Sequence, residues 1–253
     1  MFLIIKILSK IKIHFFFYIV MFICLITGNF RDFIVFSLII FVHELGHVFG
    51  GVIFKYEIIS ILVLPIGGLT KFNNGINVSL LSTFVVTVMG PLFQIIFFYL
   101  YDYFFYVSDF VFFYNFILLG FNLLPIYPLD GSKLLSVLLC FVFPFKYSHL
   151  LVVYISFLCI LCLFLFISFD LVIYLILFFL LVKCILELIN HNYLFNVFLL
   201  ERYMNNFKFR KCKIVRSVDG MFLNKKHLFL IDNTYISEDT FLKKMFDKST
   251  KLW

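Results

Sequence analysis

The stretch Phe41-Val42-His43-Glu44-Leu45-Gly46-His47-Val48-Phe49 places the pattern H-E-x-x-H inside a strongly apolar run. In a helix with 3.6 residues per turn, His43 and His47 lie one turn apart on one face, so both imidazoles can reach one zinc ion. Glu44 can reach a water on that ion without being a ligand, and can take the water's proton as it attacks a carbonyl. The pattern therefore predicts a hydrolytic metal site with His43 and His47 as ligands and Glu44 as general base.

The composition sets the environment of this pattern. Of the 253 residues, 64% are hydrophobic and 14% are charged, whereas soluble domains have about 45–50% apolar and about 25% charged residues. A soluble globular domain and a disordered chain are therefore excluded, and a multi-span membrane protein is predicted. One ionisable side chain at membrane depth costs about 2.5–3.5 kcal/mol on insertion scales. His43, Glu44 and His47 together therefore favour a bound cation, which would compensate this cost. The alternative is a pair of buried polar residues that helps helices to pack.

A bilayer core of about 30 Å requires roughly 20 apolar residues per helix. The sequence predicts an all-α polytopic membrane protein in which residues 1–200 form the membrane-spanning domain that carries the predicted metal site and residues 201–253 form a small α+β tail. About six transmembrane helices are expected, at Ile13–Thr27, Phe33–Phe54, Val78–Tyr101, Val111–Leu124 running on to Asp130, Tyr147–Ser168 and Asp170–Ile189.

Basic residues orient the predicted spans. Residues 201–253 hold 12 of the 21 Lys and Arg but 6 of the 14 Asp and Glu, and further lysines precede the first span and follow the second. Basic flanks lie on the cytoplasmic side, so both termini are expected in the cytoplasm. A basic segment beside a membrane favours contact with the lipid bilayer, and no direct binding of nucleic acid is expected.

A catalytic zinc ion usually has three protein ligands. Four further acids and histidines in the apolar region are candidates for the third: Asp130, His149, Glu187 and His191. The setting favours Asp130, because two prolines before it interrupt the helix and Gly131 follows it. Non-helical backbone at membrane depth is tolerated only where it is buried or lines a cavity. The alternative is an ordinary helix-capping aspartate at the membrane surface.

Together, H-E-x-x-H and the later N-x-x-P-x-x-P-L-D-G of residues 122–131 resemble the site-2 protease family of intramembrane zinc metalloproteases. The resemblance covers nearly all of residues 1–200 and implies that they form an intramembrane metalloprotease domain. It implies one zinc ion per chain and the following site residues: His43, His47 and Asp130 as ligands, Glu44 as general base, and Asn122 as a residue that orients the substrate.

Within this family the chain resembles the stage IV sporulation protein FB group, in which a short N-terminal span precedes the span with the H-E-x-x-H pattern. The other large bacterial group carries PDZ domains between its spans, and no gap between the spans predicted here can hold a domain of that size. This resemblance implies a bacterial cell-membrane protease that cleaves a membrane-associated substrate near the cytoplasmic face. The implied substrate is the pro-form of sigma factor K during sporulation, with membrane regulatory proteins as further partners. The alternatives are another regulatory client such as an anti-sigma factor, a zinc transporter or sensor, and an inactive membrane scaffold.

Two features near the H-E-x-x-H pattern carry further expectations. The β-branched run Ile58–Leu64 predicts an edge strand that pairs with an extended substrate, and the alternative is a buried connector. Gly46, Gly50 and Gly51 give their helix a smooth strip that either receives the Asp130 segment or serves helix packing.

The tail carries a short-range pattern of its own. Residues 227–231 and 234–236 alternate around Asp232-Asn233 and predict a β-hairpin. Ser237-Glu238-Asp239 then predicts the start of a helix with an apolar face.

Overall fold

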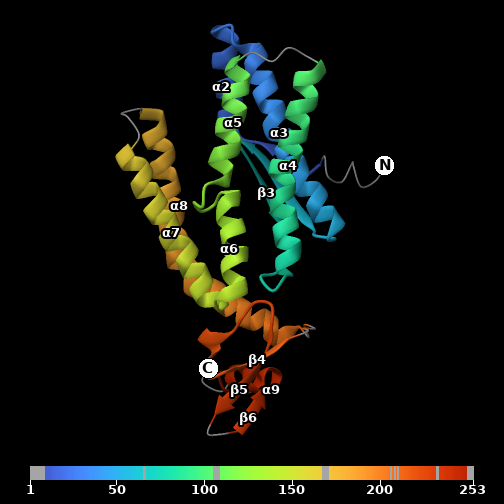
Figure 1. The fold of residues 1–253 in the computed structure, drawn as a ribbon, viewed down its shortest axis with the longest axis vertical. Coiled ribbons are helices and arrows are strands. Elements are labelled where there is room, and N and C mark those ends of the chain that lie inside the picture. Colours follow the sequence, from blue (N-terminus) through green and yellow to red (C-terminus); the bar gives the residue numbers. More distant parts are fainter. Residues whose placement is uncertain are drawn as a thin grey trace. The chain divides into compact units, whose positions relative to one another are not determined.

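The computed structural model describes residues 9–64, 67–104, 109–166, 171–205, 207, 209, 211–231 and 234–249. The chain divides into two compact units, one made of Met1–Asn74 and Ser82–Leu123, the other of Gly75–Leu81 and Leu124–Trp253. Figure 1 labels α2 to α9 and β3 to β6.

The first unit is built around apolar helices. They are α2 (Phe15–Ile26), α3 (Phe30–Ile53), α4 (Leu80–Phe104, from Ser82 onwards) and α5 (Asp109–Leu123). Helices α3 and α4 are long and apolar enough to cross a membrane, whereas the apolar parts of α2 and α5 are shorter. All four correspond to predicted spans, with ends shifted by a few residues.

Glycines allow α3 and α4 to approach closely. A Cβ atom added at Gly46 would collide with the carbonyl oxygen of Met89, and one added at Gly50 would lie 2.9 Å from the Cα of Val86. Gly46 and Gly50 therefore receive the backbone of α4 in the first unit, as the helix-packing alternative expected, whereas Gly51 faces the ring of Phe72 in β3.

A three-stranded sheet completes the first unit, so this unit is not purely helical. Its strands are β1 (Ile11–Ile13), β2 (Ile58–Leu64) and β3 (Gly67–Phe72), in the order β1-β2-β3. The strand expected at 58–64 is confirmed, but its expected edge position is wrong. The short segment before the first span pairs in parallel with residues 61–63, and β3 pairs with the other side of β2. The Lys10 ammonium also donates to the carbonyl oxygen of Ile58.

The second unit contains three further helices: α6 (Asp130–Val142), α7 (Phe145–Phe166) and α8 (Leu171–Met204). Helices α7 and α8 are also long and apolar enough to cross a membrane. They pack against each other (Figure 1). Counting α3 and α4, four described helices meet this criterion, and the count of six spans stays a prediction.

Two of these helices differ from the sequence expectation. Helix α6 was not expected, because its 13 residues are fewer than the roughly 20 that an apolar span requires. Helix α8 continues past Ile189, where the last span was expected to end, to Met204. His191 and Asn192 interrupt the apolar run there, but polar side chains do not interrupt the backbone hydrogen bonds of a helix.

The tail forms a small α+β module. It consists of β4 (Cys212–Val215), the 3-10 turn Val218–Gly220, β5 (Lys226–Ile231), β6 (Thr234–Ser237) and α9 (Glu238–Ser249). The strand order is β4-β5-β6, with β5 and β6 antiparallel, so the predicted hairpin and the helix after it are confirmed. Its core is continuous with the end of α8, since Phe229 and Leu242 belong to the same buried cluster as Phe198.

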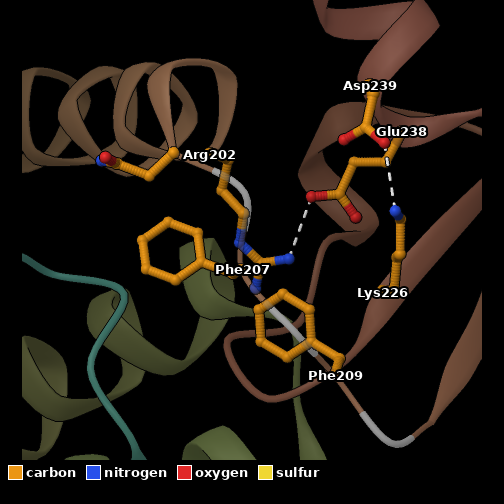
Figure 2. A pocket seen from close by; sticks show the side chains of 7 residues that line it. Arg202, Phe207, Phe209, Lys226, Glu238 and Asp239 are labelled. Carbon is orange, nitrogen blue, oxygen red and sulfur yellow. Dashed lines mark hydrogen bonds and ion pairs between the residues drawn. The ribbon is translucent and has the colours of Figure 1, made fainter.

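A buried arginine joins α8 to this module (Figure 2). Arg202 forms an ion pair with Glu238 at 3.0 Å and donates to the carbonyl oxygens of Phe222 and Leu223 at 2.8 Å. Its guanidinium carbon lies 4.2 Å from the ring centroid of Phe209. A buried charge of this kind is tolerated only when it is paired and hydrogen-bonded. The last turn of α8 and the tail module are therefore one packed structure.

Candidate metal centre

The H-E-x-x-H residues lie in the middle of α3, and all three ionisable side chains are buried. The Nε2 atoms of His43 and His47 lie 3.1 Å apart. The helix thus turns both rings toward one point, as the sequence spacing predicted.

The other ring nitrogens have partners that determine which nitrogen carries the proton. Nδ1 of His43 lies 2.8 Å from Oε1 of Gln94, and Nδ1 of His47 lies 2.9 Å from the carbonyl oxygen of Val86. The Gln94 amide nitrogen donates to the backbone and side-chain oxygens of Asn115 at 3.2 and 2.9 Å, so its oxygen must face His43. Both partner atoms are acceptors, and each histidine therefore carries its proton on Nδ1.

This assignment shows that the pair fits a metal ion. With Nδ1 protonated, a neutral ring has its lone pair on Nε2, and the Nε2 atoms of the two rings lie 3.1 Å apart. A metal ion could accept a lone pair from each ring at this point. Nδ1–H bonds to a carbonyl or amide oxygen are the outer-shell contacts that metal-binding histidines usually make.

Glu44 is held beside the pair by β3. The Thr70 hydroxyl donates to Oε2 of Glu44 at 2.6 Å. A Cβ atom added at Gly68 would collide with the Glu44 side chain, so only glycine leaves room for the carboxylate there. Oε2 is engaged by Thr70, and this contact fixes the orientation of the carboxylate.

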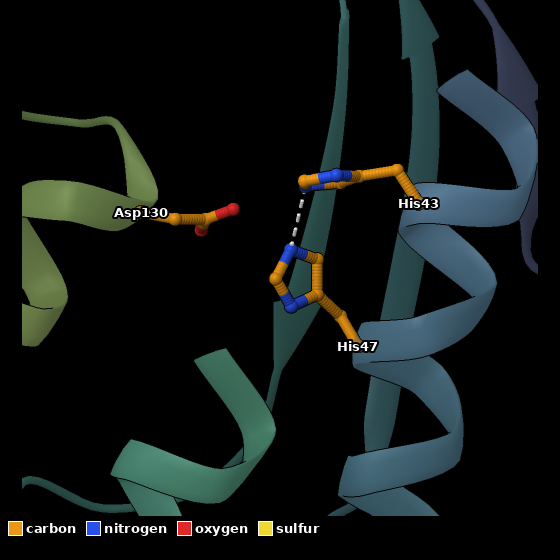
Figure 3. Close-up of side chains that lie close together, drawn as sticks. All are labelled: His43, His47 and Asp130. Atoms are coloured by element: carbon orange, nitrogen blue, oxygen red, sulfur yellow. Dashed lines mark hydrogen bonds between the residues drawn. The ribbon is translucent and has the colours of Figure 1, made fainter. Parts of the chain in front are cut away.

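Asp130 belongs to the second unit, where it is buried at the first position of α6. One of its carboxylate oxygens, Oδ1, forms an ion pair with Lys133 at 2.8 Å. Together with the pair on α3, Asp130 makes up the group of acid and histidine side chains that could hold a metal ion (Figure 3).

The other candidates for the third ligand have different partners. His149 of α7 bonds to Glu187 and to His191 of α8, at 2.9 Å in both cases. Among the described residues, these three side chains are not part of the group that could hold a metal ion. Asp130 as the third ligand stays a prediction.

Asn122 lies in the last turn of α5 in the first unit and is partly buried. Its expected role toward the substrate stays a prediction. Sequence reasoning missed the partners of the site, namely Gln94, Asn115 and Thr70. Gln94 and Asn115 are single polar residues in long apolar runs, and this signal could have identified them, because buried polar groups require partners.

Comparisons with known proteins agree with this geometry. No protein-family model matches the chain. The solved structure of the Site-2 Protease from Methanocaldococcus jannaschii matches with a TM-score of 0.51 and 26% sequence identity, over 70% of this chain and 89% of that one. The chain therefore resembles the site-2 proteases in both sequence and fold, as its motifs indicated, and this homology supports a metalloprotease.

A curated relative narrows the resemblance within that class. Stage IV sporulation protein FB of Bacillus subtilis (strain 168) is 34% identical over 147 residues, which are 55% of this chain and 51% of the relative. The chain thus spans about half the length of this relative. The resemblance to the stage IV sporulation protein FB group, which the motifs indicated, is confirmed.

Proposed function

We propose that this protein is an intramembrane zinc metalloprotease that cleaves a membrane-associated protein near the cytoplasmic face. The observation that carries the proposal is the convergence of His43 and His47 on the helix that also carries Glu44: their Nε2 atoms lie 3.1 Å apart, and each Nδ1 bonds to an acceptor oxygen. Three buried ionisable groups on one apolar helix are costly without a cation. The resemblance to the site-2 proteases supports the same assignment.

One zinc ion per chain is proposed, with His43, His47 and Asp130 as its ligands. The group of these three side chains supports the ligand set. When bound, zinc lowers the pKa of a water ligand and polarises a carbonyl. Glu44 is the proposed general base: Thr70 donates to one of its oxygens, so the other is placed to hold the proton taken up during attack.

The substrate must be extended when it is cut, because a helix keeps its carbonyl groups in its own hydrogen bonds. Strand β3 supports this step better than β2, since β3 is an outer strand of the described sheet. It also carries Gly68 and Thr70 beside Glu44. We therefore assign pairing with the substrate to β3 and orientation of the substrate to Asn122.

The proposed physiological substrate is a pro-sigma factor processed during sporulation, as the resemblance to stage IV sporulation protein FB suggests. In this proposal both termini are cytoplasmic and membrane regulatory proteins are further partners. Another regulatory client, such as an anti-sigma factor, is the alternative. Co-expression with each candidate, followed by detection of the shortened product, distinguishes the two clients.

The first experiment measures zinc per chain in the purified full-length protein. About one zinc ion is expected in the wild type and in Glu44→Gln, with stoichiometric zinc lost in His47→Ala and weakly held in Asp130→Asn. Glu44→Gln should leave a co-expressed substrate uncut, because the amide cannot accept the proton.

A matched control for this measurement is His14→Ala, which changes a histidine of the first unit outside the site and should retain zinc. A wild-type protein that is folded but binds no zinc contradicts the proposal. A Glu44→Gln variant that still cuts contradicts the assigned base.

A further inference from the structure

The last turn of α8 binds the connection between β3 and α4. The end of this connection and the first residues of α4, Gly75–Leu81, belong to the second unit together with α8. Oε1 of Glu201 accepts a hydrogen bond from the backbone N–H of Ile76 at 2.9 Å, and Oε2 accepts one from the backbone N–H of Asn77 at 3.0 Å. Two successive N–H groups that point at one anion form a backbone nest, which favours a carboxylate.

Gly75 and the Asn77 side chain complete the site of this carboxylate. A Cβ atom added at Gly75 would lie 2.7 Å from Oε1 of Glu201, so a larger residue there would displace the carboxylate. The amide nitrogen of Asn77 donates to Oε2 of Glu201 at 3.0 Å. Three donors thus converge on one side chain, and hydrogen bonds to a charged group are stronger than those between neutral groups. These contacts of Glu201 with residues 75–77 form the Glu201 clamp.

Further contacts bind the same segment to α8. Asn77 is buried, and its amide nitrogen also donates to the carbonyl oxygen of Phe198 at 3.0 Å. Its side-chain oxygen accepts from Nε of Arg202 at 2.6 Å. Leu80, at the start of α4, belongs to the same buried cluster as Phe198. Polar and apolar contacts therefore both hold the segment on α8.

The clamped segment is covalently continuous with β3. Two residues, Asn73 and Asn74, separate the end of β3 from Gly75. The backbone N–H of Asn73 donates to the carbonyl oxygen of Glu57 at 2.7 Å, so the end of β3 also has a contact within the first unit. Two residues reach at most about 7 Å when extended, and the end of β3 therefore cannot stay in place if Gly75 moves beyond this reach. The same strand carries the Thr70 hydroxyl that orients the proposed base.

We propose that Glu201 is a positioning residue for β3. By holding residues 75–77 on α8, it fixes the end of the strand to which pairing with the substrate is assigned. This inference rests on the proposed function in that one respect. Among the described residues, Glu201 is not part of the group that could hold a metal ion, so its role concerns binding of the substrate and not the chemistry at the metal.

The test compares Glu201→Gln with the matched control Asp239→Asn in the purified full-length protein. Both changes replace a carboxylate by an amide in the second unit, but Asp239 is exposed and forms a surface ion pair with Lys226. The glutamine has one acceptor oxygen, and its NH2 group faces a donor. Hydrogen–deuterium exchange is therefore expected to accelerate about 10-fold at residues 75–79 and about threefold at residues 67–72, in Glu201→Gln only.

A kinetic measurement separates positioning from stability alone. With a purified pro-sigma factor as the probe, KM is expected to rise about 10-fold in Glu201→Gln, while kcat and zinc content stay at the wild-type level. If exchange accelerates at residues 75–79 but not at residues 67–72, the contact with Glu57 alone holds the end of β3 and the positioning role is overturned. A lowered kcat with unchanged KM also overturns it.

Failure of the proposed function gives a different result. A wild type that binds no zinc contradicts the proposed function, and one that binds zinc but leaves the probe uncut contradicts the proposed client. In both cases exchange at residues 67–72 still decides whether Glu201 positions β3, and unchanged exchange at residues 75–79 overturns the clamp itself. If Glu201→Gln does not fold, Gly75→Ala tests the same clamp, because the added Cβ displaces the carboxylate.

Discussion

The two units place their proposed metal ligands in different ways. In the first, His43 and His47 lie on one continuous helix, and backbone hydrogen bonds within that helix set their spacing. In the second, Asp130 follows a non-helical segment, and residues of two other helices, Ser156 of α7 and Cys184 of α8, bond to the backbone of that segment. A spacing along a helix is a local property, whereas the position of a residue after a chain break is set by tertiary contacts.

The histidine pair and Asp130 should therefore be sensitive to different mutations. The pair on α3 should depend on helix packing and on the partners of each ring. Asp130 should depend on the contacts between α7, α8 and the preceding segment. Changes confined to one unit test whether these dependences are as separate as the structure indicates.

The largest effect is expected where α3 meets α4. In Gly46→Ala the added Cβ collides with the carbonyl oxygen of Met89, and backbone cannot move aside as a flexible side chain can. Overpacking of this kind costs about 1–3 kcal/mol. Thermal unfolding in detergent should show a lowered Tm.

Gly120→Ala is the matched control, because a Cβ atom added there would meet no neighbouring atom within 4 Å. This variant should be neutral or stabilising by up to about 1 kcal/mol. Equal Tm values for both variants would contradict this interpretation of the helix contact.

The next effect concerns the orientation of His43. In Gln94→Met the volume is nearly kept, but Nδ1 of His43 loses its acceptor and Asn115 loses a donor. Zinc affinity should fall by about 10–100-fold, with chelator competition as the measurement. Asn73→Met, an exposed change in the same unit, should retain wild-type affinity. Tight zinc binding by Gln94→Met would show that the helix alone suffices to orient the pair.

A smaller effect is expected at Glu44, whose orientation depends on β3. Thr70→Val keeps the shape but removes the hydroxyl that donates to Oε2. Cleavage of a co-expressed substrate should slow on the order of 10-fold with zinc content unchanged, because a hydrogen bond to a charged group is lost. Thr70→Ser should restore the rate. Loss of zinc in Thr70→Val would instead assign Thr70 to the stability of the ligand pair.

The smallest effect should be confined to the second unit and to acid pH. Burial raises the pKa of Glu238, but the hydrogen bond from His227 and the charge of Arg202 outweigh it, so the pKa lies below its ordinary value of 4.5. The resulting stabilisation is complete above that value and is lost as pH falls through the folded pKa. The slope cannot exceed about 1.4 kcal/mol per pH unit for one proton.

Amide exchange of β5 and α9 between about pH 5 and about pH 3 measures this dependence, with each rate corrected for intrinsic exchange. Glu238→Gln should flatten the profile, because the amide does not titrate in this range. A variant that keeps the wild-type profile would assign the acid sensitivity to other carboxylates.

Local patterns predicted the parts of the fold that depend on local spacing. The helix that carries His43 and His47, the strand at 58–64 and the hairpin before α9 all follow from periodicity and turn residues. The parallel partner of the strand at 58–64 was not predictable from such patterns. This partner, Ile11–Ile13, is only three residues long, and a segment that short is recognised as a strand only by its pairing. Helix α6 was missed because a short helix inside a larger structure does not need the length of a membrane span.

The candidate site shows the same division. The sequence named His43, Glu44, His47 and Asp130, but it left His149, Glu187 and His191 as competing ligands. Only tertiary structure shows that these three bond to one another. Likewise, Gln94 and Thr70 approach the site from α4 and β3, and no spacing along the chain relates them to the H-E-x-x-H pattern.

The length of α8 has a consequence for where the tail module can work. A helix of 34 residues is about 51 Å long at 1.5 Å per residue, while the hydrocarbon core is about 30 Å thick. A crossing along the bilayer normal leaves about 20 Å of stiff helix outside the hydrocarbon. Arg202 binds the tail module to the last turn of this helix through an ion pair and hydrogen bonds. For such a crossing, the length of α8 sets the distance between the module and the hydrocarbon.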